Sequence, residues 1–78
     1  MKKSKTARVL DIYLALEKGA VLSKESLAFE YEVDSRTIVR DLSDIRAYYA
    51  DSIVELGGRT LKYDRSNKGY RMVVEKWK

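Results

Sequence analysis

The sequence has no cysteine and no histidine among its 78 residues. Without cysteine there is no disulfide framework or thiolate metal site, and without histidine the commonest general base and transition-metal ligand is missing. A chain this short buries only about 60% of its unfolded surface, which leaves little room for a deep catalytic cleft. We therefore expect one domain spanning residues 1–78 that is not an enzyme and needs no cofactor or metal.

Long apolar runs are also absent from the sequence. No stretch approaches the roughly 18 residues that a membrane-spanning helix needs. The basic start, Met1 to Lys5, is not followed by the uninterrupted apolar segment of a signal peptide. These features predict a cytoplasmic protein with no membrane partner.

The charges that are present are unevenly distributed. Residues 1–8 carry four basic groups and no acidic one, and residues 59–78 carry seven basic and two acidic groups. Residues 9–58 carry five basic and ten acidic groups, so basic ends flank an acidic middle within a net charge of +4. Basic ends gathered on one face would bind nucleic-acid phosphates, whereas a basic tail alone can simply increase solubility.

Two helices are predicted before residue 33. The spacing of apolar residues favours a helix from about Lys5 to Lys18 that ends at Gly19. After a short extended link, Ser23 can cap a second helix from Lys24 to about Glu32. The inward-facing residues would be Val9, Ile12, Tyr13 and Leu16 of the first helix, with Leu10 and Leu14 beside them, and Leu27, Ala28 and Tyr31 of the second.

A third helix carries the most informative pattern in the chain. Asp34 can cap it, so it begins near Ser35 and extends to about residue 50. A tight turn through residues 32–34 joins it to the second helix in a helix-turn-helix arrangement. Its apolar stripe is Ile38, Leu42, Ile45 and Tyr49, and its opposite face is Arg36, Arg40, Ser43 and Ala47, flanked by Thr37 and Val39.

This opposite face is short, polar and cationic. Arginine can fork onto the guanine acceptors of the DNA major groove, and small neighbours allow the helix to approach closely. The alternative is an ordinary solvated helix surface, with Asp44 paired to Arg40 four residues away.

After Tyr49 the pattern changes from helical to alternating. Strands are predicted at Ile53 to Leu56, Arg59 to Asp64 and Tyr70 to Glu75. Three helices followed by a small antiparallel sheet make an α+β winged helix-turn-helix, in which residues 65–69 form a basic wing. Leu61, Tyr63, Tyr70, Met72 and Val74 would point inward, and Lys62 and Arg71 outward.

Three segments carry a family resemblance: Tyr31 to Leu42, Leu61 to Asp64 and Lys68 to Arg71, of which the most specific pieces are R-T-I-x-R-D-L at 36–42 and Gly-Tyr-Arg at 69–71. Together they resemble the N-terminal winged helix of the DeoR-like and WYL-domain bacterial transcriptional regulators. The resemblance covers nearly the whole chain. It implies a regulator whose third helix enters the major groove, and it leaves room for an effector domain or partner protein that is not present in this chain.

The resemblance also assigns roles to residues. It carries over Arg36, Thr37 and Arg40 as DNA contacts, while Asp41 is expected to orient Arg8 or Lys5 rather than touch DNA. Together with the residue pattern it gives two groups: base-reading residues Arg36, Thr37, Arg40 and Ser43, and phosphate or wing residues Lys2, Lys3, Lys5, Ser35, Arg65, Lys68 and Arg71.

The expected partner is double-stranded DNA, bound by a homodimer on two half-sites. Phe29 lies off the inward face of its helix, so it would either mark a dimer surface or pack under a neighbouring loop. Two other functions fit parts of the pattern. One is a winged-helix protein interaction module, such as a small phage or accessory protein, and the other is RNA or single-strand binding through the sheet and its aromatic residues.

Overall fold

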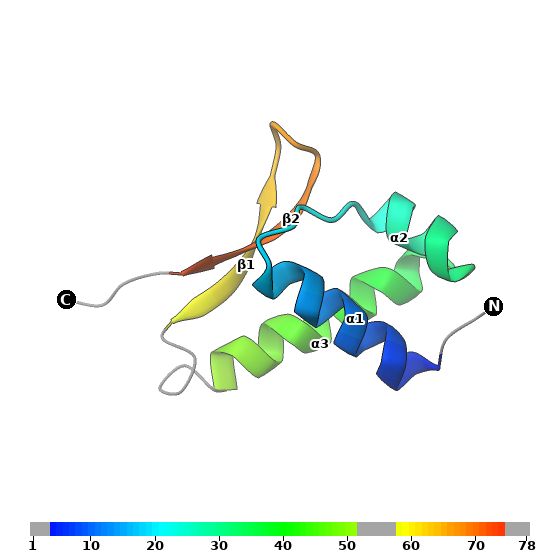
Figure 1. The fold of residues 1–78 in the computed structure, drawn as a ribbon, viewed down its shortest axis with the longest axis horizontal. Helices are drawn as coiled ribbons and strands as arrows, with labels where there is room; N and C mark the ends of the chain where they lie inside the picture. The colour runs from blue at the N-terminus through cyan, green and yellow to red at the C-terminus, as the bar shows by residue number, and fades with distance from the viewer. Residues whose placement is uncertain (1–3, 52–57, 75–78) are drawn as a thin grey trace.

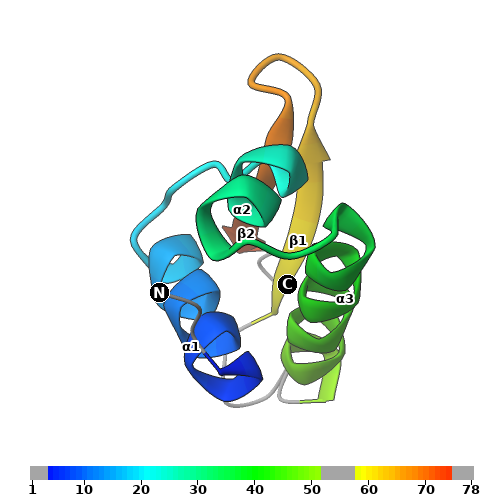
Figure 2. The ribbon, with the colours of Figure 1, turned by 90° about the vertical axis from the view of Figure 1, so that its right-hand side faces the viewer.

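The computed structural model describes residues 4–51 and 58–74. Its elements follow the order α1 (Lys5–Glu17), α2 (Lys24–Tyr31), α3 (Ser35–Asp51), β1 (Arg59–Asp64) and β2 (Gly69–Val74) (Figure 1). Helices α1 and α3 lie on opposite sides of the view in Figure 2, with α2 above them and the hairpin behind. The predicted α+β fold, winged-helix-like in its arrangement, is confirmed. The strand expected at 53–56 lies outside the described residues.

Local capping chemistry sets the ends of the first two helices. Gly19, at φ +87°, provides the left-handed residue that ends α1. The Ser23 hydroxyl accepts a hydrogen bond from the Ser26 N–H at 3.2 Å and caps α2. Glu32 ends α2 in the left-handed region at φ 57°, so the chain turns sharply before α3. None of the helices in the described part of the chain is long and apolar enough to cross a membrane.

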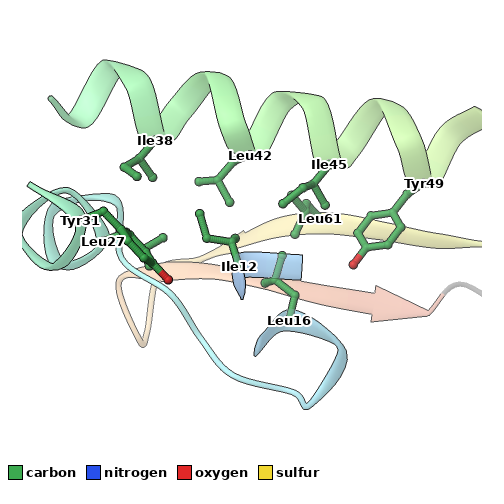
Figure 3. Close-up of a cluster of buried hydrophobic side chains, with 9 residues drawn as sticks. All are labelled: Ile12, Leu16, Leu27, Tyr31, Ile38, Leu42, Ile45, Tyr49 and Leu61. Carbon is green, nitrogen blue, oxygen red and sulfur yellow. The ribbon is translucent and has the colours of Figure 1, made fainter. Parts of the chain in front are cut away.

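The core lies where the three helices meet the inner face of β1. All four residues of the predicted α3 stripe are buried, and Ile12 and Leu16 of α1 face them (Figure 3). Leu10 and Leu14 stay 55% and 54% exposed, so they lie outside this core. The full cluster comprises Ile12, Leu16, Leu27, Tyr31, Ile38, Leu42, Ile45, Tyr49 and Leu61.

The two strands pair in antiparallel register, with Leu61 opposite Met72 and Tyr63 opposite Tyr70. Leu61 is buried as predicted, but the inward prediction is wrong for Tyr63 and Val74, which are 53% and 50% exposed. Tyr63 lies one pair from the loop and Val74 at the opposite end of the hairpin, so this face of the sheet is buried at Leu61 in its middle and exposed at these two residues. Lys62 and Arg71 are exposed, as expected.

The link between α1 and α2 fastens the hairpin to the helices. Leu22 and Tyr70 exchange two backbone hydrogen bonds, of 2.8 Å from the Leu22 N–H and 2.7 Å from the Tyr70 N–H. A Cβ atom at Gly69 would lie 2.8 Å from the Val21 side chain and 2.9 Å from the Leu22 carbonyl oxygen. Glycine is therefore required at 69 by this close approach, and the strand begins one residue earlier than predicted.

A buried ion pair joins α1 to α3. The Arg8 guanidinium donates from Nε to Asp41 Oδ2 and from a terminal nitrogen to Asp41 Oδ1, the latter at 3.2 Å. The two side chains are only 8% and 1% exposed. This hydrogen bonding outweighs desolvation and raises the pKa of Arg8, which stays charged. Of the two partners expected for Asp41, Arg8 and Lys5, the one found in the structure is Arg8.

The first prediction concerns this pair. Asp41→Ala or Arg8→Ala strands one buried charge, so each should lower the free energy of unfolding by about 3–5 kcal/mol. Lys5 and Asp44 join the same two helices at 3.6 Å but are 67% and 59% exposed. Lys5→Ala should therefore change stability by less than about 1 kcal/mol. Urea unfolding measures both, and equal losses for the buried and exposed pairs would contradict the assignment.

A second prediction concerns Tyr49, whose hydroxyl donates to Glu17 at 3.3 Å. Burial, together with the nearby Glu17 carboxylate, raises the pKa of Tyr49. The stabilisation from a raised pKa is complete below the unfolded value of about 10 and declines as pH rises from there towards the folded pKa. Unfolding measured from pH 8 to 11 should therefore show a shallower alkaline decline for Tyr49→Phe than for the wild type; identical slopes would refute this.

Candidate nucleic-acid interface

The first turn of α3 is ordered by Asp34. Its Oδ1 accepts a hydrogen bond from the Arg36 backbone N–H at 2.8 Å, which is the expected cap. The same oxygen also accepts from Arg36 Nε at 3.3 Å. These bonds from Arg36, the backbone one first, lower the pKa of Asp34 below the usual aspartate value. Asp34 therefore fixes both the start of the helix and the direction of its first arginine.

The outer face of α3 is open to solvent along its length. The Arg36 side chain is 87% exposed. Arg40 and Ser43 are exposed as well, whereas Thr37 and Ser35 are half-buried at the edge of the face. The base-reading set predicted from the sequence therefore lies on one helix, with its two arginines one turn apart.

The acidic residues of α3 are mostly held away from this face. Asp41 is turned into the core against Arg8, and Asp44 pairs with Lys5 across the α1–α3 boundary. The expected pairing of Asp44 with Arg40 is wrong, because Asp44 pairs with Lys5 of α1 instead. Asp51 remains exposed at the far end of the helix. Arg40 consequently has no ion pair with another described residue.

The loop at 65–68, hereafter the wing, is organised by the residue before it. Asp64 Oδ1 accepts hydrogen bonds from the N–H groups of Ser66 at 3.0 Å and Asn67 at 3.2 Å. Its other oxygen accepts from the Asn67 side-chain amide at 2.8 Å. Lys68 takes a left-handed conformation at φ 53°, which closes the loop onto β2. One carboxylate thus gives the wing a defined shape.

The predicted phosphate-binding residues are dispersed. Arg65 and Lys68 are exposed on the wing. Arg71 is half-exposed and pairs with Asp64 at 3.4 Å, so it supports the wing from β2. Lys5 belongs to α1, and the predicted contacts Lys2 and Lys3 lie outside the described residues.

The wing and the first turn of α3 lie toward the same end of the molecule. In both views the wing projects beyond the helices at the top, and α3 begins at its upper end close to α2 (Figures 1 and 2). The N-terminal half of α3, with Arg36 and Arg40, is therefore the half that lies toward the wing.

The sequence pattern did not find every residue of this region. Tyr63 is predicted to face the core, but it stands exposed one residue before Asp64 and packs edge-on against Tyr70 with ring centroids 5.2 Å apart. Its place one pair from the loop was the available signal, because few other side chains cover a residue near the tip of a hairpin. Among the described residues no three acidic side chains form a group that could hold a metal ion.

Phe29 is 88% exposed on α2, so the prediction that it packs under a loop is wrong. Its role as a dimer surface stays a prediction.

A third prediction tests the wing. The hydrogen bonds from Asn67, and then from Ser66, lower the pKa of Asp64, so its contribution to the loop is complete above the unfolded value of about 3.9 and is lost as pH falls through the folded pKa. In an NMR titration the amide signals of Ser66 and Asn67 should move with a midpoint below about 3.9. Asp64→Asn is the control and should abolish that step. A midpoint at the usual aspartate value would contradict the geometry.

The sequence was compared with models of known protein families and with curated proteins. No family model matches the chain, and no curated protein matches it significantly.

Proposed function

We propose that this domain binds double-stranded DNA sequence-specifically, as a transcriptional regulator or its DNA-binding module. The observation that carries the proposal is the outer face of α3, the second helix of the helix-turn-helix, where Arg36 and Arg40 are exposed one turn apart. A helix in this position can enter the major groove and place arginine forks against base edges.

Electrostatics support the same use of the surface. Asp41, next to Arg40 in sequence, is neutralised inside the core by Arg8, so its charge does not oppose DNA at the outer face. Arg65 and Lys68 add exposed positive charge on the wing. In this proposal the wing binds backbone or minor groove while α3 reads bases.

The family assignment is part of the proposal. The segments at 31–42, 61–64 and 68–71 resemble the DeoR-like and WYL-domain regulators, and they lie in the turn before α3, the first half of α3 and the part of the hairpin next to the wing. A bacterial or phage regulator of that type is the identity we propose.

We further propose that the domain acts as a homodimer. One domain of this size buries too little DNA surface for tight specific binding, and two copies on adjacent half-sites would double it. Leu10, Leu14 and Phe29 supply exposed apolar side chains away from the outer face of α3. Sedimentation with and without DNA tests this; one copy per duplex would refute it.

A fourth prediction separates base reading from phosphate binding. After a preferred duplex has been selected from a random pool, Arg40→Ala should lose about 1–3 kcal/mol of discrimination at one base pair. Lys68→Ala should weaken all duplexes alike and reduce the slope of log affinity against log salt by about 0.9. Fluorescence anisotropy at several salt concentrations measures both.

Arg46 provides the matched control. It is an exposed arginine on the same helix, but its position is about 120° around the helix from Arg40. Arg46→Ala should leave base discrimination unchanged. Equal, sequence-blind losses for Arg40 and Arg46 would overturn base reading. Preference for single strands, or no binding to duplex at low salt, would overturn the proposed function in favour of the sheet-binding and protein-docking alternatives.

A further inference from the structure

We propose that Asp34 is a positioning residue for base reading: by holding Nε of Arg36 it presents the two terminal nitrogens of that guanidinium, end-on, to a guanine. This inference rests on the proposed function and deepens it. In this inference Asp34 both caps α3 and contributes to the recognition of a base.

The geometry comes from one carboxylate oxygen with two donors. Asp34 Oδ1 is 2.8 Å from the Arg36 backbone nitrogen and 3.3 Å from its Nε. The backbone bond anchors the carboxylate to the rigid first turn of α3, and the second bond links the arginine side chain to that anchor. Arg36 is thereby held at its backbone nitrogen and at Nε, although its side chain is 87% exposed.

This arrangement restricts how Arg36 can meet a base. An arginine can fork onto guanine either through Nε and one terminal nitrogen or through both terminal nitrogens. With Nε bound to Asp34, only the pair of terminal nitrogens is available for the bidentate contact with guanine O6 and N7. Holding the side chain in advance also reduces the conformational entropy that Arg36 loses on binding.

Arg40 gives an internal comparison on the same face. It is exposed on the next turn of α3 and makes no ion pair with another residue of the described segments. The two arginines therefore differ in how far their side chains are ordered before binding. Arg36 is already held by Asp34 in the free domain, whereas Arg40 becomes ordered only when DNA binds. Specificity at the base read by Arg36 should depend on a second residue, whereas specificity at the base read by Arg40 should not.

Asp34 also carries a cost that distinguishes this role from simple electrostatics. A carboxylate near the DNA backbone repels phosphates, so its removal should strengthen binding to every sequence if charge were its only effect. Asp44 provides a matched case, because it is an aspartate on α3 with 59% of its side chain exposed, against 56% for Asp34 just before the helix.

The experiment has one part without DNA. In NMR spectra of the free domain, the Nε–H proton of Arg36 should exchange with water more slowly than that of Arg40. Asp34→Ser keeps a good helix cap but is too short and uncharged to hold the guanidinium. In that variant the two exchange rates should become equal. If Arg36 and Arg40 already exchange equally in the wild type, the positioning role is overturned whatever the DNA results.

The second part measures discrimination at the base pair that Arg36→Ala identifies. Asp34→Ser should reduce that discrimination between about twofold and tenfold, the scale of one immobilised side chain. Asp34→Asn, which retains an acceptor oxygen, should lie between Asp34→Ser and the wild type. Asp44→Ser should tighten binding to all duplexes without changing discrimination. Asp34→Ser in an Arg36→Ala background should have no further effect on that base pair.

The outcomes separate the two proposals. If Asp34→Ser behaves like Asp44→Ser, Asp34 acts only by its charge and the inference fails while DNA binding stands. If Arg36→Ala affects no particular base pair although Arg40→Ala does, Arg36 is not a base reader, and the inference fails with that part of the proposed function alone. If neither arginine affects a base pair, base reading by α3 as a whole is overturned.

Discussion

The buried pair of Arg8 and Asp41 is the interaction on which the arrangement of this domain depends. It crosses from α1 to α3 inside an otherwise apolar core, where an unpaired charge would be costly to leave. Two hydrogen bonds hold the guanidinium against the carboxylate, so α3 turns Asp41 toward α1. Asp41 faces inward, and Arg36 and Arg40 on the same helix are exposed to solvent. One helix therefore carries both the buried ion pair and the outer face that we propose binds DNA.

Other aspartates near the surface also have structural partners. Asp44 is occupied by Lys5, Asp64 organises the wing while supporting Arg71, and Asp34 caps α3. Each carboxylate serves a local structural purpose close to the cationic surface. Within the acidic middle of the sequence, Asp34, Asp41 and Asp44 therefore have structural partners, whereas Glu30 and Glu32 remain exposed. Net charge alone would not reveal this, since it counts groups without recording where their partners lie.

The wing shows how a small domain can hold an exposed hairpin in place. Two strands alone are marginally stable in water, and this pair gains a bridge from the link between α1 and α2, where Leu22 bonds to Tyr70. Gly69 permits the contact because any side chain there would collide with Val21 and Leu22. The hairpin is thereby fixed to the helical body close to its loop end, and the loop itself extends beyond the helices (Figure 1).

The sequence by itself determined the helices, the face that α3 buries and the hairpin, because capping, periodicity and turn chemistry act over a few residues. The basic partner of Asp41 was expected from the family resemblance. The sequence also placed Arg36 and Arg40 together, since residues one turn apart on a helix share a face. Tertiary structure decided what local rules cannot: that Lys5 rather than Arg40 meets Asp44, that Tyr63 lies past the end of the core, and that Leu22 adds a strand contact. Each of these depends on which distant segments come to lie side by side, and no local periodicity encodes that.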